Sequence, residues 1–310
     1  MNKKVLVTGG AGFIGSHLAE KLLGKGYSVR VIDNFSTGNR NNIKQISDDI
    51  ELIDGDIQDY HVVSKAMKDI NIVFHQAALP SVPRSIQDPI ATNNVNINGT
   101  LNLLWAAVEY KVDQFLFASS SSVYGDTVEL PKHEKLIPNP LSPYAVSKLT
   151  AESYCKVFSK IYGLKTVCLR YFNVFGPRQN PDSQYAAVIP KFIKMINENK
   201  QPIIFGDGLQ SRDFTFVDNV VKGNLLALEM GSEKNLIMNC ACNQQITLNN
   251  LVEEVNKLLG KNIKPLYHPE RPGDIKHSYA DIRLAQEKIS YVPDVNFKKG
   301  LEITVDYLTK

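Results

Sequence analysis

Residues 8–15 read TGGAGFIG and lie between an apolar run, residues 5–7, and a segment with helical periodicity, residues 17–24. A strand, a glycine-rich turn and a helix in this order form the setting in which glycine spacing predicts a nucleotide-binding loop. The patterns G-x-G-x-x-G and G-x-x-G-x-x-G overlap here and use Gly9, Gly10, Gly12 and Gly15. Because a helix is expected to begin near Ile14, its free N–H groups and positive dipole end face the loop. We therefore predict that the loop holds the pyrophosphate of a dinucleotide.

The residue that ends the second predicted strand indicates which dinucleotide is bound. Asp33 stands 18 residues after Gly15, where a carboxylate accepts hydrogen bonds from the adenosine ribose hydroxyls. The same carboxylate would repel a 2′-phosphate, so the sequence favours NAD, while Arg30 and Arg40 are near enough in sequence to keep NADP open. Asp56, after the third predicted strand, is a candidate contact to the adenine edge, and a solvated loop aspartate fits its spacing as well.

Short β-rich runs alternate with helical segments along the first half of the chain. The predicted strands are residues 4–8, 28–32, 50–53, 72–75, 114–118 and 165–170. Helical periodicity predicts helices over residues 17–24 and 98–110. This alternation predicts an α/β fold with a Rossmann-type, doubly wound parallel sheet covered by helices.

The texture of the sequence changes near residue 173, after which prolines are frequent and the elements become shorter. We predict a dinucleotide-binding Rossmann domain over residues 1–172 and a smaller α/β substrate-binding domain over residues 173–310. A helix is expected over residues 217–230. It belongs to a segment, about residues 212–240, that returns to the first domain.

Composition and charge exclude several classes of protein. The chain has 310 residues, of which 43% are hydrophobic, and a formal net charge of +3 without any block of like charges. These values predict a folded cytoplasmic protein that has neither nucleic acid nor a membrane as partner. The four cysteines and six histidines show no metal-ligand spacing, so we predict no metal site.

Residues 138–148 read PNPLSPYAVSK and predict the start of a helix that carries a reactive pair. Ser142 is a suitable N-cap, and Pro143 suits the first helical position. Tyr144 and Lys148 then lie four residues apart on one helix face, where the ammonium is expected to lower the pKa of the phenol. This arrangement predicts that Tyr144 is a general base near neutral pH.

Four consecutive serines, residues 119–122, follow the apolar residues 115–117. They stand at the carboxyl end of a predicted parallel strand, which is where sheets of this kind bind ligands. One of these hydroxyls is expected to bond the reacting hydroxyl of a substrate beside Tyr144.

Several motifs together resemble those of the extended short-chain dehydrogenase/reductase family. They are TGGAGFIG, SSSSVYG, Y-x-x-x-K and RYFNVFGPR, the last at residues 170–178. The resemblance continues through GDGLQSRDFTFVDN, residues 206–219, and RPGDIKHS, residues 271–278, and so covers almost the whole chain. Within this family the chain is most similar to the UDP-sugar 4-epimerases, above all those that act on UDP-N-acetylglucosamine (UDP-GlcNAc).

The resemblance implies a role for individual residues of this sequence. It makes Tyr144 the base, Ser120 the catalytic hydroxyl, and Lys148 the residue that binds the nicotinamide ribose. Besides Tyr144 and Lys148, the implied NAD contacts are Gly9, Gly12, Phe13, Ile14, Gly15, Asp33, Asn34, Asp56, Ile57, Ala77, Asn96 and Phe172. The implied UDP-sugar contacts are Ser81, Ser121, Ser122, Asn173, Gln179, Ala187, Val188, Lys191, Phe205, Arg212, Arg271, Asp274 and Ser278.

The implied reaction is NAD-dependent epimerisation at C4 of a UDP-hexose, with residues 173–310 as the UDP-sugar-binding domain. Tyr144 would remove the 4-hydroxyl proton while hydride passes to a retained NAD, and the 4-keto sugar would turn over before the hydride returns. Arginines such as Arg212 suit this substrate independently, because guanidinium groups bind phosphates in a bidentate manner. Enzymes of this kind pair through helices that match residues 98–110 and 144–161, which implies a homodimer.

Other activities of the same family make different demands on the serine run. The 4,6-dehydratases have a motif that resembles T-D-E at these positions, and the UDP-glucuronate decarboxylases have one that resembles T-S-E. This chain has Ser120, Ser121 and Ser122 there and so lacks the carboxylate. A UDP-glucuronate 4-epimerase shares the serine run and stays open; it would need a further cation near the hexose, and nearby Arg178 is expected to be structural. A non-catalytic NAD-binding sensor on the same fold also stays open, although retention of the serine, tyrosine and lysine argues against it.

The choice of sugar depends most on Ser278. By its distance from Arg271 and Asp274 it aligns with the residue beside the hexose 2-substituent, which resembles tyrosine in epimerases restricted to UDP-glucose and UDP-galactose. Serine leaves room for an acetamido group, and a surface serine before a helix is the open alternative. An N-acetylated sugar is also favoured by small Ala187 and by the segment AALPSVPRS, residues 77–85, which resembles that of epimerases acting on such sugars. We predict interconversion of UDP-GlcNAc and UDP-GalNAc, with UDP-glucose and UDP-galactose also accepted.

Overall fold

The central element of the fold is a parallel sheet of seven strands. The structure, a computed structural model, describes residues 3–182, 187–230, 233–270 and 275–310. The strand order is β11-β6-β5-β4-β1-β2-β3, and every neighbouring pair is parallel. The strands are β1 (Lys4–Thr8), β2 (Ser28–Asp33), β3 (Ile50–Asp54), β4 (Ile72–His75), β5 (Gln114–Ser120), β6 (Lys165–Tyr171) and β11 (Asn235–Cys240). The predicted doubly wound sheet is therefore confirmed.

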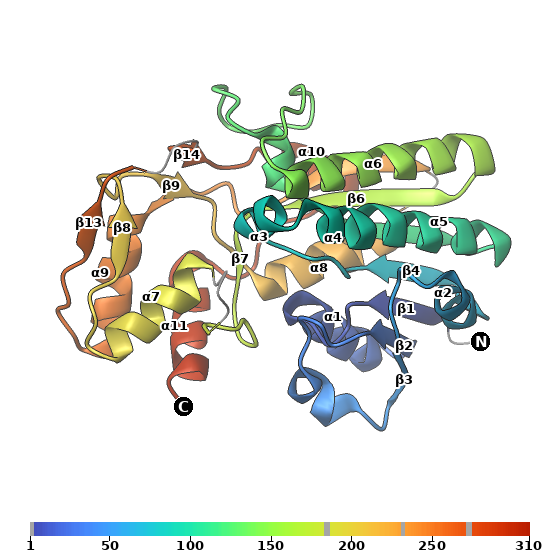
Figure 1. Cartoon of the computed structure of the whole chain (residues 1–310), viewed down its shortest axis with the longest axis horizontal. Coiled ribbons are helices and arrows are strands. Elements are labelled where there is room, and N and C mark those ends of the chain that lie inside the picture. Colours follow the sequence, from blue (N-terminus) through green and yellow to red (C-terminus); the bar gives the residue numbers. More distant parts are fainter. Residues whose placement is uncertain (1–2, 183–186, 231–232, 271–274) are drawn as a thin grey trace.

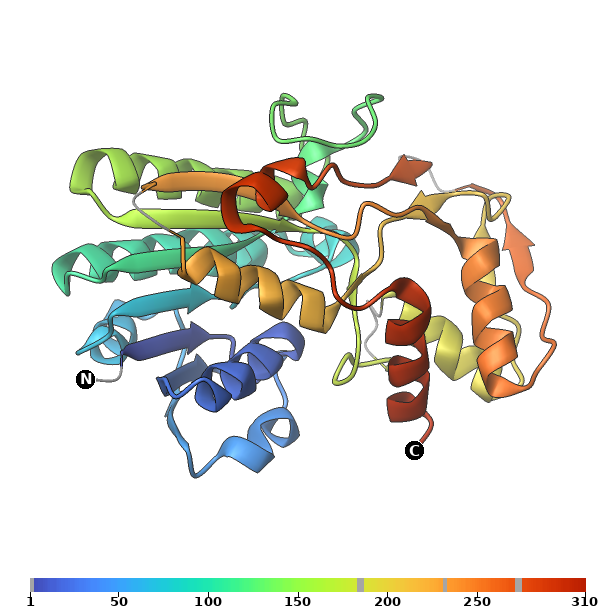
Figure 2. The same ribbon diagram turned by 180° about the vertical axis from the view of Figure 1, so that it is seen from behind.

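Helices cover both faces of the sheet. One face, toward the viewer in Figure 2, carries α1 (Phe13–Gly24), α8 (Val217–Leu228) and α10 (Arg283–Ile289). The other face, toward the viewer in Figure 1, carries α2 (Tyr60–Met67), α5 (Gly99–Glu109) and α6 (Pro143–Tyr162). Each layer of helices buries its own apolar core against the sheet.

Short helical segments follow three of the strands. After β4 the chain forms α3 (Val82–Gln87), α4 (Pro89–Asn93) and a π-helical turn (Asn94–Asn98) before α5 begins. A 3₁₀ turn (Arg40–Ile46) follows β2, and a second one (Ser121–Tyr124) directly follows β5. Ser81 has a φ of +96° and caps α3 by accepting a hydrogen bond from Arg84 N.

A second, smaller lobe lies beside the sheet (Figure 1). Its helices are α7 (Val188–Asn197), α9 (Leu248–Leu259) and α11 (Phe297–Leu308). Its short strands are β7 (Val174–Phe175) with β10 (Thr215–Phe216), β8 (Ile203–Phe205) with β13 (Leu266–His268), and β9 (Ser211–Arg212) between β12 (Ile246–Thr247) and β14 (His277–Ser278). A core that includes Phe175, Phe192 and Phe297 fills this lobe.

The positions of the elements agree closely with the sequence pattern. All six predicted strands begin at the predicted residue, and four of them extend one or two residues further. The sequence does not predict β11, which reads NLIMNC and has an asparagine on each side of its short apolar run, residues 236–238. This strand lies within the segment, residues 212–240, that was expected to return to the first domain. The division after residue 172 stays a prediction.

Two kinds of feature are absent from the described ranges. None of the helices there combines the length and the apolar character that crossing a membrane requires. The same ranges contain no cluster of three His, Cys, Asp or Glu side chains that could hold a metal ion.

Candidate active site

A cleft of about 1310 Å³ opens at the carboxyl ends of the central strands. The strand order reverses between β1 and β4, and this is the point at which doubly wound sheets bind ligands. The predicted residues that line the cleft are Gly9, Gly12, Phe13, Ile14, Gly15, Asp33, Asn34, Asp56, Ile57, Ala77, Ser81, Ser120, Ser121, Ser122, Tyr144, Lys148, Asn173, Gln179, Ala187, Arg212 and Ser278. One cavity thus brings together most of the residues that the sequence singled out.

The glycine-rich loop leaves no room for side chains. Gly9 has a φ of +66°, and a Cβ added there would lie 2.8 Å from the backbone of Ala77. A Cβ on Gly15 would overlap the carbonyl oxygen of Gly9. Helix α1 begins at Phe13 directly after this loop, and no side chain caps its N-terminus. The first N–H groups of α1 and the bare backbone of the loop therefore fit a pyrophosphate.

Asp33 ends β2 with its carboxylate fixed by backbone amides. It accepts hydrogen bonds from Ala11 N at 2.9 Å and from Phe35 N at 2.8 Å. The side chain is 8% exposed, and burial raises its pKa. On the same wall of the cleft, Asn34 Nδ2 donates to Asp56 Oδ2 at 2.8 Å. Asp33 retains lone pairs for further donors, which fits the two hydroxyls of a ribose.

The two arginines that kept NADP open are engaged elsewhere. Arg30 is buried and donates to two backbone carbonyl oxygens at 2.8 and 2.7 Å. Arg40 pairs with Asp54 at 2.5 Å on the surface. Neither arginine lines the cleft, so the geometry beside Asp33 favours a 2′-hydroxyl over a 2′-phosphate.

Two of the predicted cofactor contacts do not reach the cleft with their side chains. Asn96 is 2% exposed, accepts from Leu79 N at 2.8 Å and donates to Ser147 Oγ at 3.0 Å. Phe172 is fully buried with its ring centroid 6.1 Å from that of Tyr124. Asn96 thus supports the cleft wall from behind, and Phe172 belongs to a small core beneath it. The sequence pattern cannot separate such supporting residues from direct contacts.

The start of α6 carries the predicted base and its lysine. Ser142 caps the helix by accepting from Ala145 N at 3.2 Å, and Pro143 takes the first position, as predicted. Tyr144 and Lys148 both line the cleft, and Lys148 Nζ lies 5.8 Å from the centroid of the Tyr144 ring. Lys148 Nζ also donates to Ala118 O at 2.8 Å, which fixes the ammonium against the end of β5.

The expected effect of the lysine on the phenol is wrong for this structure. Burial raises the pKa of Tyr144, and a hydrogen bond with the Ser120 side chain acts in the opposite direction. Burial also lowers the pKa of Lys148 to about 8, while the nearby Glu152 carboxylate acts to raise it. Desolvation is the largest cause of both pKa shifts, and spacing along a helix does not reveal how deeply a pair is buried.

The serine run divides into hydroxyls with different partners. Ser119 Oγ donates to Glu152 Oε1 at 2.6 Å behind the cleft. Ser120 Oγ accepts from Ser122 N at 3.2 Å and lies beside Tyr144. Ser122 Oγ is buried and has no hydrogen-bond partner among the described residues. Ser120 is thus the serine that the structure brings to the predicted base.

Three further predicted substrate contacts line a second, smaller cavity. Its volume is about 350 Å³, and Val188, Lys191 and Phe205 line it. Asn173, Ala187 and Arg212 border both cavities, so the two are neighbours. The sequence did not predict this division of the substrate contacts into two cavities. A ligand with a sugar at one end and a flat base at the other matches such a pair of cavities.

Ser278 lines the larger cavity from β14. Strand β14 pairs in parallel with β9, which places Ser278 opposite Arg212. The predicted sugar-selecting residue and a predicted diphosphate contact are therefore neighbours on one small sheet. The other two residues that anchored this alignment, Arg271 and Asp274, lie outside the described residues.

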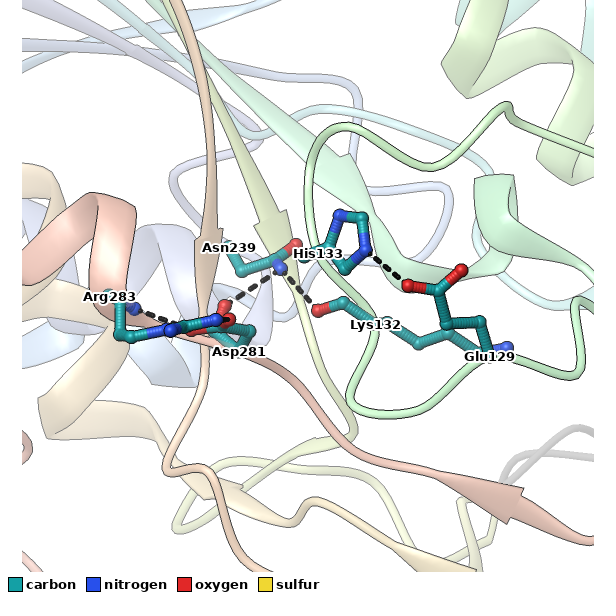
Figure 3. Close-up of polar contacts among 6 residues, drawn as sticks. All are labelled: Glu129, Lys132, His133, Asn239, Asp281 and Arg283. Atoms are coloured by element: carbon teal, nitrogen blue, oxygen red, sulfur yellow. Dashed lines mark hydrogen bonds and ion pairs between the residues drawn. The ribbon is translucent and has the colours of Figure 1, made fainter.

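Asn239, on β11, joins three segments around this part of the site. Its Nδ2 donates to Lys132 O at 2.9 Å and to Asp281 O at 3.0 Å (Figure 3). Its Oδ1 accepts from the Tyr124 hydroxyl at 2.7 Å, and Tyr124 ends the turn that follows β5. Ser278 precedes Asp281 by three residues. Asn239 therefore ties the wall that carries the serines to the wall that carries Ser278.

Arg84, on α3, is a cation of the cleft wall that the sequence analysis missed. It falls within the segment AALPSVPRS, which was used only for its resemblance to epimerases that act on N-acetylated sugars. The helical start at Ser81, rather than any charge pattern, brings Arg84 to the cleft.

A family model described as the NAD dependent epimerase/dehydratase family matches residues 5–241. The chain belongs to this family. NAD is the family's cofactor, in agreement with the geometry around the glycine-rich loop and Asp33. The predicted resemblance to the extended short-chain dehydrogenase/reductase family is confirmed with it.

Relatives of known name cover almost the whole chain. A putative UDP-glucose 4-epimerase of Methanocaldococcus jannaschii is 40% identical, over 98% of each chain. The structure of a UDP-N-acetylglucosamine 4-epimerase from Methanobrevibacter ruminantium M1, in complex with UDP-N-acetylmuramic acid, has a TM-score of 0.95 and 43% identity and covers 99% of this chain and 98% of its own. A UDP-glucuronic acid 4-epimerase from Bacillus cereus, in complex with UDP-glucuronic acid and NAD, has a TM-score of 0.92 and 37% identity, with 99% of each chain covered.

Proposed function

We propose that this chain is an NAD-dependent UDP-sugar 4-epimerase. The observation that carries the proposal is the position of Tyr144, Ser120 and Lys148 in the same cleft as the glycine-rich loop. A base beside a dinucleotide site suits removal of a hydroxyl proton together with hydride transfer from the same carbon. The relatives described above are 4-epimerases of UDP-sugars, which supports this reaction class.

The residues of the cleft divide the work of this reaction. Tyr144 takes the proton of the sugar 4-hydroxyl, and Ser120, which is hydrogen-bonded to the phenol, orients that hydroxyl. Bound NAD supplies the carbon that accepts the hydride and returns it. Lys148 uses one N–H on Ala118 O and keeps two more for a ribose hydroxyl of the cofactor. Because the same tyrosine serves both directions, the sugar must turn between them, and the wide cleft gives it room.

The two cavities suit the two ends of a UDP-sugar. Asn173 and Gln179 line the larger cavity, where the hexose would lie near Tyr144. Arg212 borders both cavities, so its guanidinium fits the diphosphate between them. Lys191 and Phe205 line the smaller cavity, where the ring of Phe205 offers an apolar surface to a base. This assignment also explains why the implied substrate contacts fall into two groups.

For the sugar itself we propose UDP-GlcNAc and UDP-GalNAc, with UDP-glucose and UDP-galactose as further substrates. The support is the small side chain of Ser278 in the wall of the larger cavity, together with small Ala187 at its border. Both leave space for an acetamido group. The relative from Methanobrevibacter ruminantium, a UDP-N-acetylglucosamine 4-epimerase, points to the same substrate.

UDP-glucuronate is the second candidate substrate. Arg84 in the cleft wall is the observation that favours it, because a carboxylate on the hexose needs a cation near it. The relative from Bacillus cereus acts on this sugar. Arg178, the cation considered from the sequence, instead pairs with Glu20 at 2.6 Å and does not line the cleft.

We also propose that the protein forms a homodimer through α5 and α6. Apolar side chains are exposed on these helices, among them Trp105 at 41%, Ile161 at 65% and Tyr162 at 48%. The rings of Trp105 and Tyr162 contact each other edge to face, with centroids 5.8 Å apart. An apolar patch of this kind suits association with a second copy.

A direct comparison of substrates tests the proposed function. Purified protein would be incubated separately with UDP-GlcNAc, UDP-glucose and UDP-glucuronate, and the products resolved by anion-exchange chromatography. We expect UDP-GalNAc and UDP-galactose as products and little turnover of the glucuronate. Exclusive turnover of UDP-glucuronate would move the assignment to the second candidate. No product from any of the three, with NAD bound, would favour a non-catalytic sensor.

A further inference from the structure

A buried ion pair lies directly behind the wall that carries the proposed base. Glu152 on α6 and Arg170 on β6 are 2% and 3% exposed. Their contact is bidentate, with Arg170 Nε to Glu152 Oε1 at 2.8 Å and Arg170 Nη2 to Glu152 Oε2 at 2.7 Å. Burying two charges costs so much desolvation free energy that such a pair adds little net stability compared with apolar residues. The pair therefore calls for an explanation beyond stability.

The carboxylate of Glu152 is hydrogen-bonded to the catalytic wall, and its charge acts on Lys148. Glu152 follows Lys148 by one helical turn, so both side chains lie on the same face of α6. Its Oε1 also accepts from the Ser119 hydroxyl at 2.6 Å, and Ser119 immediately precedes Ser120. One buried anion thus faces the lysine on α6 and the serine end of β5.

Among the residues that the structure describes, Glu152 is the anion whose charge acts on the pKa of Lys148. Tyr144 lies one turn earlier on α6. Burial raises the pKa of its phenol, so it is not an anion near neutral pH. His75 on β4 lies between the hydroxyls of Thr8 and Thr100, each at 2.8 Å, and burial lowers its pKa to about 3, so it carries no charge. Arg170, on β6, is held by Glu152 itself.

We propose that Glu152 is a positioning residue of the reaction: its carboxylate keeps the Lys148 ammonium charged and, through Ser119, holds Ser120 beside Tyr144. Arg170 holds both oxygens of this carboxylate, so its orientation is fixed. The inference rests on the proposed roles of Lys148 and Ser120. The burial of Lys148, which lowers its pKa to about 8, makes the charge sensitive to loss of a neighbouring anion.

The test compares Glu152→Gln with the wild-type holoenzyme in two measurements. The first is the pH profile of kcat with UDP-GlcNAc, and the second is titration of Lys148 by NMR of protein labelled with ¹³C at lysine Cε. We expect the alkaline limb of kcat and the Lys148 midpoint to move together to lower pH, by about one pH unit or more. The titration needs no substrate, so it reports on this inference even if the proposed reaction is wrong.

Three further variants separate charge from packing. Ser119→Ala keeps the carboxylate, so we expect kcat to fall about tenfold with the alkaline limb unchanged. Glu302→Gln, which removes an exposed carboxylate 2.8 Å from Lys299, should change neither measurement. If Glu152→Gln fails to fold because Arg170 is left unpaired, the double variant Glu152→Gln/Arg170→Met removes both charges and should still show the shift. A Lys148 midpoint and an alkaline limb that stay at the wild-type pH in the folded variants would overturn the proposal.

Discussion

Single residues set the chemistry of the cleft, and burial has the largest effect on the pKa of Tyr144 and of Lys148. Tyr144 and Lys148 share one face of α6, yet burial raises the pKa of the phenol and lowers that of the lysine to about 8. Both shifts favour the neutral forms of the two groups. The Ser120 hydroxyl is the neighbour that acts against this for the phenol. Activity therefore depends on polar groups that counter desolvation at this point.

Tyr144→Phe should abolish most of the activity without disturbing the fold. The variant removes only the hydroxyl that is proposed to take the substrate proton, and it leaves the ring, Lys148 and the glycine-rich loop in place. We expect kcat to fall by roughly 10²–10⁴-fold, the usual contribution of a general base. Circular dichroism and the NAD released on denaturation serve as controls. Near-native turnover would remove Tyr144 from the mechanism.

Ser278→Tyr should change the choice of sugar rather than the chemistry. A tyrosine in the cleft wall would occupy the space of the acetamido group, so turnover of UDP-GlcNAc should be lost while that of UDP-glucose persists. Ser278→Ala, which keeps the space open, is the matched control. The ratio of kcat/KM for the two substrates is the measurement. An unchanged ratio in the tyrosine variant would show that Ser278 does not line the sugar site.

At the scale of elements, the sequence predicts what depends on local pattern. The strand starts, the helix cap at Ser142 and the glycine-rich loop all follow from apolar runs, capping chemistry and φ requirements within a few residues. The seventh strand, β11, is not predictable in this way, because its place depends on parallel pairing with β6 across the chain. Similarly, Glu152 looks like one more polar residue of α6 until β6 brings Arg170 against it.

Gly15→Ala should release the cofactor. The added Cβ would overlap the carbonyl oxygen of Gly9, so the loop must shift away from the pyrophosphate that it is proposed to hold. Gly24→Ala, at the other end of α1, meets no atom within 4 Å and is the matched control. The NAD content per purified chain should fall sharply in the first variant and stay at the wild-type level in the second. Equal contents would contradict the assignment of the loop.

At the scale of the whole molecule, the structure combines an NAD-binding sheet with a lobe that completes the substrate site. Their shared cleft explains why residues as far apart in sequence as Gly9 and Ser278 line one cavity. Most of the site residues that the family resemblance predicted line this cavity, but the second cavity and Arg84 were not predicted. Both depend on how the lobe and α3 approach the sheet, which no local pattern encodes.

The dimer proposal predicts that a charge on α6 separates the subunits. Ile161→Glu would place a carboxylate on the exposed apolar face of α5 and α6, where a second copy is proposed to pack. Val292→Glu, at an exposed position away from these helices, is the control. Sedimentation velocity should show a monomer for the first variant and a dimer for the control and the wild type. A wild-type monomer would contradict the proposed interface.

The central claim is that a hydride leaves C4 of the sugar and returns to the same carbon within one cleft, without exchange with solvent. The most direct measurement uses UDP-GlcNAc deuterated at C4, purified protein and no added cofactor, with the product examined by NMR. The account predicts UDP-GalNAc that keeps the deuterium at C4 and gains no hydrogen from water at that carbon. Loss of the label to water, or no product at all from protein that carries NAD, would contradict it.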